Sequence, residues 1–224
     1  MADVGHSQGM IRLLSPCTEE EWSYADVLIA ELKEWDVQQS KAFGFDRDDV
    51  LGVFYPDEMG SIRCDSVRPN GCFLLATDAS SPVGCAAFRR TAPTACELYD
   101  VYVRPSFRGR GIASMLLQRL MSDAQAAGYQ TMFLETAAFM HSAHTLYRSL
   151  HFQVRDPYRT VPSRFAKATI WMECRLPELR RSRSGLSGVP PRTTLRHIPA
   201  PVRRCGTKVC SGPSPSGLAR RDRA

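Results

Sequence analysis

The stretch ELYDVYVRPSFRGRGIA, residues 97–113, joins two local patterns. An apolar, strand-like run covers residues 97–103, and a strongly amphipathic helical pattern begins near Gly111. Backbone N–H groups at a helix start have no partner within the helix, so together with the helix dipole they form an anion site. Glycines at 109 and 111 leave room for a diphosphate to reach those N–H groups, and the arginine before each glycine adds positive charge. The turn therefore predicts a pyrophosphate site at the end of a β-strand.

Two better-known phosphate-binding motifs do not fit this turn. No Lys-Ser/Thr pair follows the glycines, and the spacing Gly-x-Gly-x-x-Gly is absent. A plain surface turn with glycines remains the alternative interpretation.

The segments around the turn predict an α+β domain. Three apolar runs separated by short turns indicate an antiparallel meander, and they cover residues 72–77, 83–89 and 97–103. Two helical patterns and two further strands follow, at residues 111–127, 131–136, 143–150 and 168–176. We expect a mixed, mostly antiparallel sheet flanked by helices, within a domain over residues 11–176.

The segment before the meander is less regular. Residues 11–14 predict a short strand, and Thr18 predicts the start of a helix whose apolar residues share one face. Residues 36–70 are polar and broken by Gly and Pro, so we expect a long irregular connection with a short helix around Lys41.

The net charge of +6 is unevenly distributed. Residues 177–224 hold 11 Arg and Lys and 2 Asp and Glu, whereas residues 1–176 hold 18 basic and 21 acidic side chains. Few large apolar residues follow Pro177, so we expect a disordered basic tail over 177–224 and a flexible N-terminus over 1–10. Such a tail either binds nucleic acid or is a solvated extension.

Location and metal content are predicted from missing signals. No apolar run reaches the ~18–20 residues that span a bilayer, and residues 1–10 lack the pattern of a secretory signal, so we expect no membrane contact and a cytoplasmic protein. Four cysteines fall in apolar runs, at positions 72, 85, 96 and 174, where a small hydrophobic residue fits. No Cys-x-x-Cys occurs, and His141 and His144 have no third ligand nearby, so we expect no metal.

Three pieces of sequence, in order, resemble the GNAT superfamily of acetyl-CoA-dependent N-acetyltransferases. They are ELYDVYVRP at 97–105, RGRGIA at 108–113 and AHTLYRSLHF at 143–152. The second piece matches the family signature Arg/Gln-x-x-Gly-x-Gly/Ala. The resemblance implies a GNAT-like acyl-CoA N-acyltransferase fold that transfers an acetyl group directly from acetyl-CoA to an amine within a ternary complex.

The resemblance also implies where acetyl-CoA binds. The pyrophosphate would lie on the turn, and the pantetheine arm would follow the strand where it separates from the strand at 131–136. The residues implied in binding are Val101, Tyr102, Val103, Arg108, Gly109, Arg110, Gly111, Ile112, Ala113 and Ser114. Regular alternation along the strand would place residues 97, 99, 101 and 103 on one face and residues 98, 100 and 102 on the other.

Acyl transfer to an amine requires a general base and benefits from an acid that protonates the leaving thiolate. The resemblance implies Tyr147 as the acid and Glu97, acting directly or through water, as the base. Glu97 could instead be a structural carboxylate paired with an arginine, with Asp100 or Glu135 as the base. Tyr147 also falls at a helical core position, so packing is its alternative role.

Two positions depart from the family pattern. His151 stands where glycine is usual, at a position that commonly adopts a left-handed backbone. Met140 stands where many members have an asparagine that contacts the cofactor.

The acceptor is expected to be an amine of a small molecule or a peptide. Acidic residues within 46–58 could attract a cationic amine, and Tyr158 is a candidate for the acceptor side. Two other functions stay open: a non-catalytic acyl-CoA-binding sensor with the same fold, and a nucleic-acid-associated protein acting through its basic tail. The oligomeric state is also open, a homodimer included.

Overall fold

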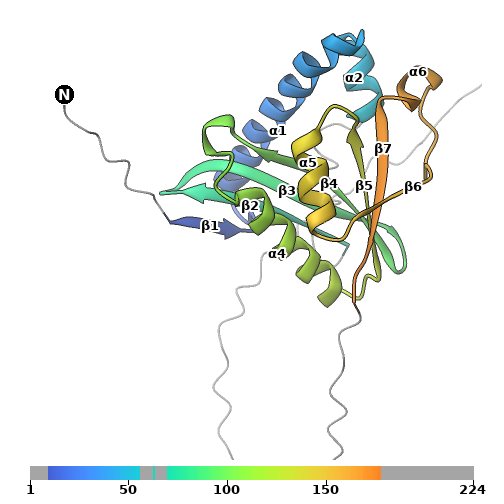
Figure 1. The fold of residues 1–224 in the computed structure, drawn as a ribbon. Helices are drawn as coiled ribbons and strands as arrows, with labels where there is room; N and C mark the ends of the chain where they lie inside the picture. Colours follow the sequence, from blue (N-terminus) through green and yellow to red (C-terminus); the bar gives the residue numbers. More distant parts are fainter. Residues whose placement is uncertain (1–9, 56–62, 64–69, 178–224) are drawn as a thin grey trace, which may run out of the picture. The chain divides into compact units, whose positions relative to one another are not determined.

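A seven-stranded sheet forms the centre of the part of the chain that the structure describes (Figure 1). The computed structural model describes residues 10–55, 63 and 70–177. The strand order across the sheet is β1-β2-β3-β4-β5-β7-β6. The strands are β1 Ile11–Leu14, β2 Gly71–Asp78, β3 Ser81–Ala92, β4 Ala95–Val103, β5 Thr131–Ala137, β6 Gln153–Arg155 and β7 Thr169–Arg175.

The pairing of β4 with β5 is parallel, and the other neighbouring strands pair antiparallel. A parallel pair needs a crossover connection, which is supplied by helix α4, Ile112–Ala126. The predicted α+β fold with a mixed, mostly antiparallel sheet is therefore confirmed.

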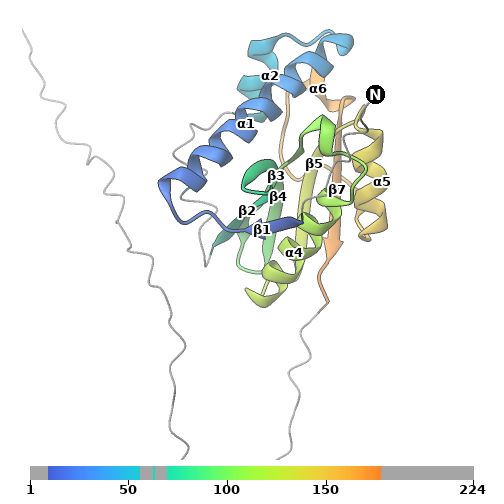
Figure 2. The same ribbon diagram turned by 90° about the vertical axis from the view of Figure 1, so that its left-hand side faces the viewer.

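Helices cover both faces of the sheet because its strands are apolar on both sides. In β2, Phe73 and Leu75 pack in a cluster with helix α1, Glu19–Ser40, whereas Cys72 and Leu74 pack in a cluster with α4 on the other face. Figures 1 and 2 show α1 on one face and α4, with α5, on the other. Helix α5 covers His141–Ser149.

The start of α1 follows from a capping box. The Thr18 hydroxyl accepts from the Glu21 N–H at 3.1 Å, and the Glu21 carboxylate accepts from the Thr18 N–H at 3.1 Å. Leu28 and Ile29 are then placed on the buried face by helical spacing. The helix start predicted at Thr18 is confirmed.

The prediction of an irregular connection from residue 36 was wrong at its start. Helix α1 continues to Ser40, a short 3-10 helix covers Lys41–Phe43, and helix α2 covers Arg47–Phe54. Buried Val37 extends the apolar face of α1 beyond the predicted end. A second capping box, formed by Asp46 and Asp49, begins α2.

Strand β6 and helix α6, Ser163–Ala166, were also not predicted. The ring of Phe165 in α6 stacks on that of Phe45 at 4.3 Å between centroids, and meets Phe54 of α2 edge-on at 5.4 Å. A one-turn helix has too few residues to show a periodic pattern, so this packing could not be read from spacing.

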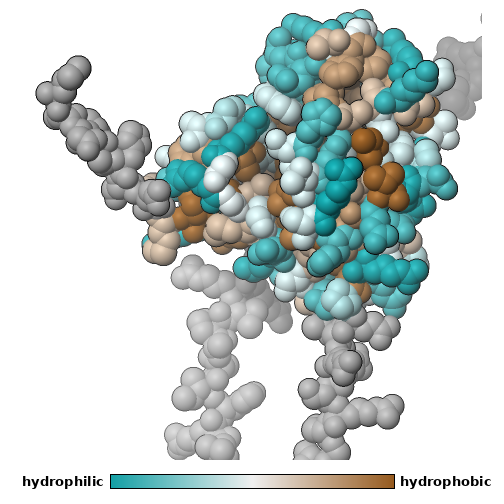
Figure 3. Space-filling model, in the orientation of Figure 1, coloured by the Kyte–Doolittle hydropathy of each residue, from teal (hydrophilic) through white to brown (hydrophobic). Residues whose placement is uncertain are grey.

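The surface of the described residues mixes polar and apolar groups. The largest exposed apolar side chains are scattered over separate elements, and hydrophilic and hydrophobic residues alternate on the face drawn in Figure 3. Within 10–55, 63 and 70–177, no helix combines the length and apolar character needed to cross a membrane. The predicted flexible N-terminus and basic tail lie outside the described residues, apart from Met10 and Pro177.

Candidate active site

Strands β4 and β5 separate halfway along β4. Their parallel register runs from Ala95 opposite Thr131 to Leu98 opposite Leu134, while β4 itself continues to Val103. A gap between two parallel strands leaves backbone groups of β4 available to a ligand in place of a partner strand. The separation that the family resemblance implied is therefore present.

A β-bulge at Asp100 changes which residues of β4 share a face. The register with β3 shifts between Cys85 and Ala87, and Asp100 has a φ of 51°. The predicted regular alternation is therefore wrong beyond Tyr99, because the bulge inserts an extra residue. Tyr102 joins Tyr99 in the cluster around α1, whereas Val101 and Val103 join Leu98 in the cluster around α4.

The turn after β4 has the backbone geometry of an anion site. Gly109 and Gly111 have φ of 76° and 75°, values that glycine adopts readily. A Cβ built on either glycine would meet nothing within 4 Å, so the space in front of the turn is open. The first bond within α4 runs from the Met115 N–H to the Gly111 carbonyl, at 3.0 Å. The N–H groups of residues 112–114 therefore have no helical partner.

Two arginines are fixed at this turn by contacts within the protein. The Arg108 Nε donates to the Val103 carbonyl at 2.9 Å, and its guanidinium lies 5.0 Å from the ring centroid of Trp35. The Arg110 guanidinium lies 3.7 Å from the Asp78 carboxylate and over the ring of Phe107. Both cations thus stay beside the turn, and Arg108 ties it to the end of β4.

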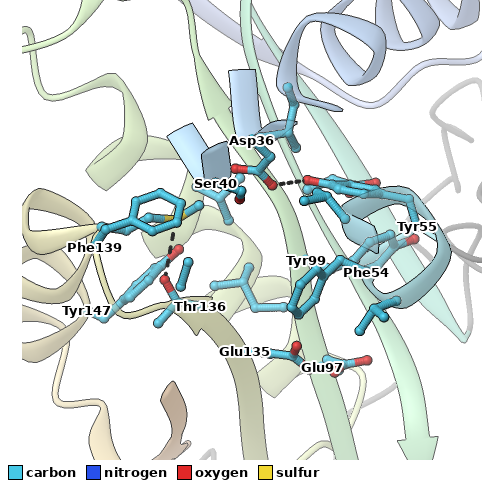
Figure 4. Close-up of a pocket in the computed structure, with 18 of the residues that line it drawn as sticks. Asp36, Ser40, Phe54, Tyr55, Glu97, Tyr99, Glu135, Thr136, Phe139 and Tyr147 are labelled. Carbon is cyan, nitrogen blue, oxygen red and sulfur yellow. Dashed lines mark hydrogen bonds between the residues drawn. The ribbon is translucent and has the colours of Figure 1, made fainter. Parts of the chain in front are cut away.

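A cavity of about 300 Å³ lies between these strands and helices α1, α2 and α5. Figure 4 shows the Asp36–Tyr55 pair on one side of it, with Glu97 and Glu135 together on another. Its lining includes Leu32, Asp36, Val50, Val53, Phe54, Tyr55, Arg89, Glu97, Tyr99, Asp100, Glu135, Met140, Tyr147 and Arg159.

Tyr147 lines the cavity from α5, and its side chain is 6% exposed. Its ring packs against Phe152 at 5.9 Å between centroids. Burial, together with the nearby charge of Asp36, raises the pKa of the Tyr147 hydroxyl. Within the described part of the chain no hydrogen bond is made by that hydroxyl, so it is a protonated group available to a ligand in the cavity.

Glu97 lines the same cavity, and both of its carboxylate oxygens have partners. Arg89 donates to Oε2 from Nε at 3.0 Å and from Nη2 at 2.9 Å. The Tyr158 hydroxyl donates to Oε1 at 2.6 Å. The pairing with an arginine foreseen as its alternative role is thus present, and the role as a base stays a prediction.

The other two candidates for the base differ from each other. Glu135 accepts two hydrogen bonds from Arg159, at 2.7 and 2.8 Å, and burial raises its pKa. Asp100 lacks such a partner: its Oδ2 atom is buried and has no hydrogen bond within the described residues.

Asp36 was missed by sequence reasoning, because it fell in the segment assigned to a loop. Its Oδ2 accepts from the Tyr55 hydroxyl, and its Oδ1 is buried without a hydrogen-bond partner among the described residues. The available signal was the spacing Leu32, Asp36, Ser40, which places two polar residues on the apolar face of α1.

Burial raises the pKa of both Asp36 and Asp100. It raises the pKa of Asp36 to about 6, against a lowering by the Tyr55 hydrogen bond. It also raises the pKa of Asp100 to about 6; Lys33 and Arg89 lower this pKa, and Asp36 raises it further.

These carboxyls should make the protein less stable as the pH rises. Each carboxyl has a pKa of about 6 in the folded protein, against an ordinary value of 3.8, so it holds its proton more tightly when folded. Its contribution to the free energy of unfolding is therefore complete below about pH 4 and is lost as the pH rises through about 6. A shift of this size corresponds to at most about 3 kcal/mol per group. At pH 8 we expect the free energy of unfolding of Asp100→Asn to exceed that of the wild type by about 1–2 kcal/mol. At pH 5 this difference should be smaller.

Urea unfolding at both pH values measures this difference. Asparagine tolerates the positive φ at this position, so the variant keeps its backbone. A difference between variant and wild type that does not change with pH would contradict the shift.

Two departures from the family pattern are accommodated locally. His151 has a φ of 67°, so the left-handed backbone expected at this position is present, and histidine is among the residues that adopt it more readily. Met140 is the N-cap residue of α5 and makes no side-chain capping hydrogen bond; its sulfur accepts from the Thr136 hydroxyl at 3.5 Å.

Comparison with known proteins places these features in a family. The model of the Acetyltransferase (GNAT) family matches residues 9–152. An uncharacterised N-acetyltransferase of Schizosaccharomyces pombe is 33% identical over 104 residues, which cover 46% of this chain and 64% of that protein, less than two thirds of its length. An IAA acetyltransferase of Azospirillum brasilense is 32% identical over 114 residues, covering 50% and 74%.

A solved structure shares the fold at low identity. The PaiA N-acetyltransferase of Thermoplasma acidophilum, determined in complex with coenzyme A, is 15% identical to this chain and superposes with a TM-score of 0.53. The match covers 74% of this chain and 99% of that one. The fold, the glycine turn and the family match agree, and the chain belongs to the GNAT acetyltransferase family.

Proposed function

We propose that this protein transfers an acetyl group from acetyl-CoA to an amine, directly and within a ternary complex. The observation that carries the proposal is the open turn with unpaired N–H groups, set at the end of a strand that separates from its neighbour. That gap leads along β4 to a cavity lined by Tyr147 and by carboxylates. Membership of the family and relatives named as acetyltransferases support the same activity.

The diphosphate of acetyl-CoA would accept hydrogen bonds from the N–H groups of residues 109–114. Arg108 and Arg110 would add positive charge beside it. The pantetheine arm would lie along Val101–Val103 in the gap. The Val103 carbonyl already accepts from Arg108, so we expect the arm to use the remaining backbone groups of this segment.

The acetyl group would then reach the cavity. The neutral amine attacks the thioester carbonyl, so a C–N bond forms and, as the tetrahedral intermediate collapses, the C–S bond breaks. The amine loses a proton to Glu97, directly or through water, and the departing thiolate takes a proton from Tyr147. Holding both substrates in one cavity supplies much of the acceleration without a covalent enzyme intermediate.

Two measurements on the purified protein test this function together. Calorimetry with acetyl-CoA reports binding, and release of free thiol with a panel of amines reports transfer. We expect both signals. Heat without thiol release from any amine would favour the sensor, and no heat at millimolar acetyl-CoA would overturn the proposal.

Replacing Glu97 with glutamine should lower kcat/KM for the amine about tenfold at pH 7. The amide keeps the size of the side chain and can still accept from Tyr158, but it cannot take a proton. The rate of thiol release at limiting amine measures the effect.

Glu173→Gln is the matched control, because Glu173 also pairs with an arginine, Arg155 at 2.7 Å, but does not line the cavity. An equal loss in both variants would point to a structural role for Glu97. No loss in Glu97→Gln would shift the base to Asp100 or Glu135.

A further inference from the structure

Two carboxyl oxygens of cavity-lining residues are buried and have no hydrogen-bond partner among the described residues. They are Oδ1 of Asp36, in α1, and Oδ2 of Asp100, in β4, and both residues line the cavity. Buried polar atoms in folded proteins are nearly always hydrogen-bonded, and a buried charge without a partner is unfavourable. Such a pair facing one cavity indicates a ligand that supplies donors and positive charge.

The position of Asp100 depends on the bulge in β4. Leu98 and Val101 both lie on the α4 side of the sheet. In a regular strand one residue separates neighbours on the same face, but here two do, so one residue is inserted. The Cys85 thiol donates to the Asp100 carbonyl at 3.4 Å and holds this bend. Bulges beside active sites commonly re-aim a side chain, and here the re-aimed carboxyl lines the same cavity as Asp36.

The other charges of the cavity are paired with each other. Glu97 is bound by Arg89, and Glu135 by Arg159. Lys33 is close enough to act on Asp100, but it lies 5.3 Å from the Tyr55 ring centroid and is outside the cavity lining. The excess negative charge therefore comes from Asp36 and Asp100, both of which are largely ionised at pH 7.5 because the pKa of each is about 6.

The rest of the lining is mostly apolar, with Ser40 and Thr136 as polar members, and the space is small. Leu32, Val50, Val53 and the rings of Phe54 and Tyr99 line it. In a cavity of about 300 Å³, such walls suit a short chain of methylene groups. The Asp36–Tyr55 pair and Glu97 lie on different sides of this space (Figure 4), so a chain could extend from one to the other.

We propose that Asp36 and Asp100 bind one ammonium group of a short aliphatic diamine, whose other nitrogen is acetylated beside Glu97 and Tyr147. This inference rests on the proposed acetyltransferase function and names its acceptor class. A cation between the two carboxylates satisfies both buried oxygens and removes their mutual repulsion. An amine with a carboxylate at that end is repelled by the same pair.

Three acceptors of similar length test the proposal in the thiol-release assay: 1,4-diaminobutane, 1-aminobutane and 4-aminobutanoate. We expect kcat/KM for the diamine to exceed that for 1-aminobutane about tenfold or more, and 4-aminobutanoate to be the poorest acceptor. Equal values for the first two would overturn the diamine site and leave the acetyltransferase function intact.

Asp100→Asn should lower the ratio of kcat/KM for the diamine to kcat/KM for 1-aminobutane about tenfold, because the amide cannot pair with the ammonium group as a carboxylate does. Asp156→Asn, which changes an exposed carboxylate that does not line the cavity, is the control. A preference that persists in Asp100→Asn overturns the assignment.

Calorimetry with 1,4-diaminobutane and the coenzyme A-loaded protein gives a readout that does not depend on catalysis. Binding to the wild type that weakens about tenfold in Asp100→Asn supports the site, whereas no heat from the diamine overturns it. Absence of both acetyl-CoA binding and thiol release with every amine would instead overturn the proposed function.

Discussion

Replacing Tyr147 with phenylalanine is expected to lower kcat about 10²-fold while KM for acetyl-CoA changes less than about threefold. The hydroxyl is the only group removed, and proton transfer by a positioned side chain typically contributes a factor of this size. The raised pKa of Tyr147 keeps its proton in place throughout the neutral range, so the group is ready to protonate a leaving thiolate. Thiol release at saturating acetyl-CoA and amine measures the loss.

The fold should tolerate this change. The phenylalanine ring preserves the packing against Phe152, and no hydrogen bond from the hydroxyl to a described residue is lost. Tyr129→Phe is the matched control, since Tyr129 is equally buried and its hydroxyl donates to the Asn70 carbonyl at 3.0 Å, outside the cavity. A kcat within twofold of the wild type in Tyr147→Phe would leave this tyrosine with a packing role only.

Gly111→Ala should weaken acetyl-CoA binding about 10²-fold. In the free protein the added methyl group meets no atom within 4 Å, so the cost there is backbone strain at a φ of 75°, about 1–2 kcal/mol of stability. In the complex, however, the methyl group stands where the diphosphate must approach. Loss of two charge-assisted hydrogen bonds at about 1.5 kcal/mol each gives the expected change in affinity.

Gly128 provides a control at the other end of α4. It has a φ of 93° and open space around its Cβ position, so Gly128→Ala has a similar strain without lying near the turn. Calorimetry with acetyl-CoA, combined with thermal unfolding, separates the two effects. If both variants lost stability and neither lost affinity, the turn would not be the diphosphate site.

Long, repetitive patterns allowed most of the fold to be predicted. The alternation of turns and apolar runs predicted the meander of β2, β3 and β4, and the apolar spacing in 112–126 predicted α4. The four cysteines assigned to apolar runs are buried in the sheet. These elements depend on local propensity and on one buried face, both of which are visible in a single sequence.

The details of the site depend on features that periodicity cannot show. A bulge needs one extra residue, and nothing in ELYDVYV indicates whether that residue is Asp100 or a neighbour. The last turns of α1 are polar at several positions, which concealed both the helix and Asp36. The partners of Glu97, namely Arg89 and Tyr158, are 8 and 61 residues away in sequence, so only the fold brings the three together.

The short parallel register between β4 and β5 has a mechanical consequence. The antiparallel group β1–β4 and the antiparallel group β5, β7 and β6 are joined by a parallel register of four residue pairs, from Ala95–Thr131 to Leu98–Leu134. This pairing is shorter than the pairings on either side of it, β3 with β4 and β5 with β7. A ligand bound in the gap beyond Leu98 would contact both groups of strands. Its binding free energy would therefore raise the free energy of unfolding of the domain.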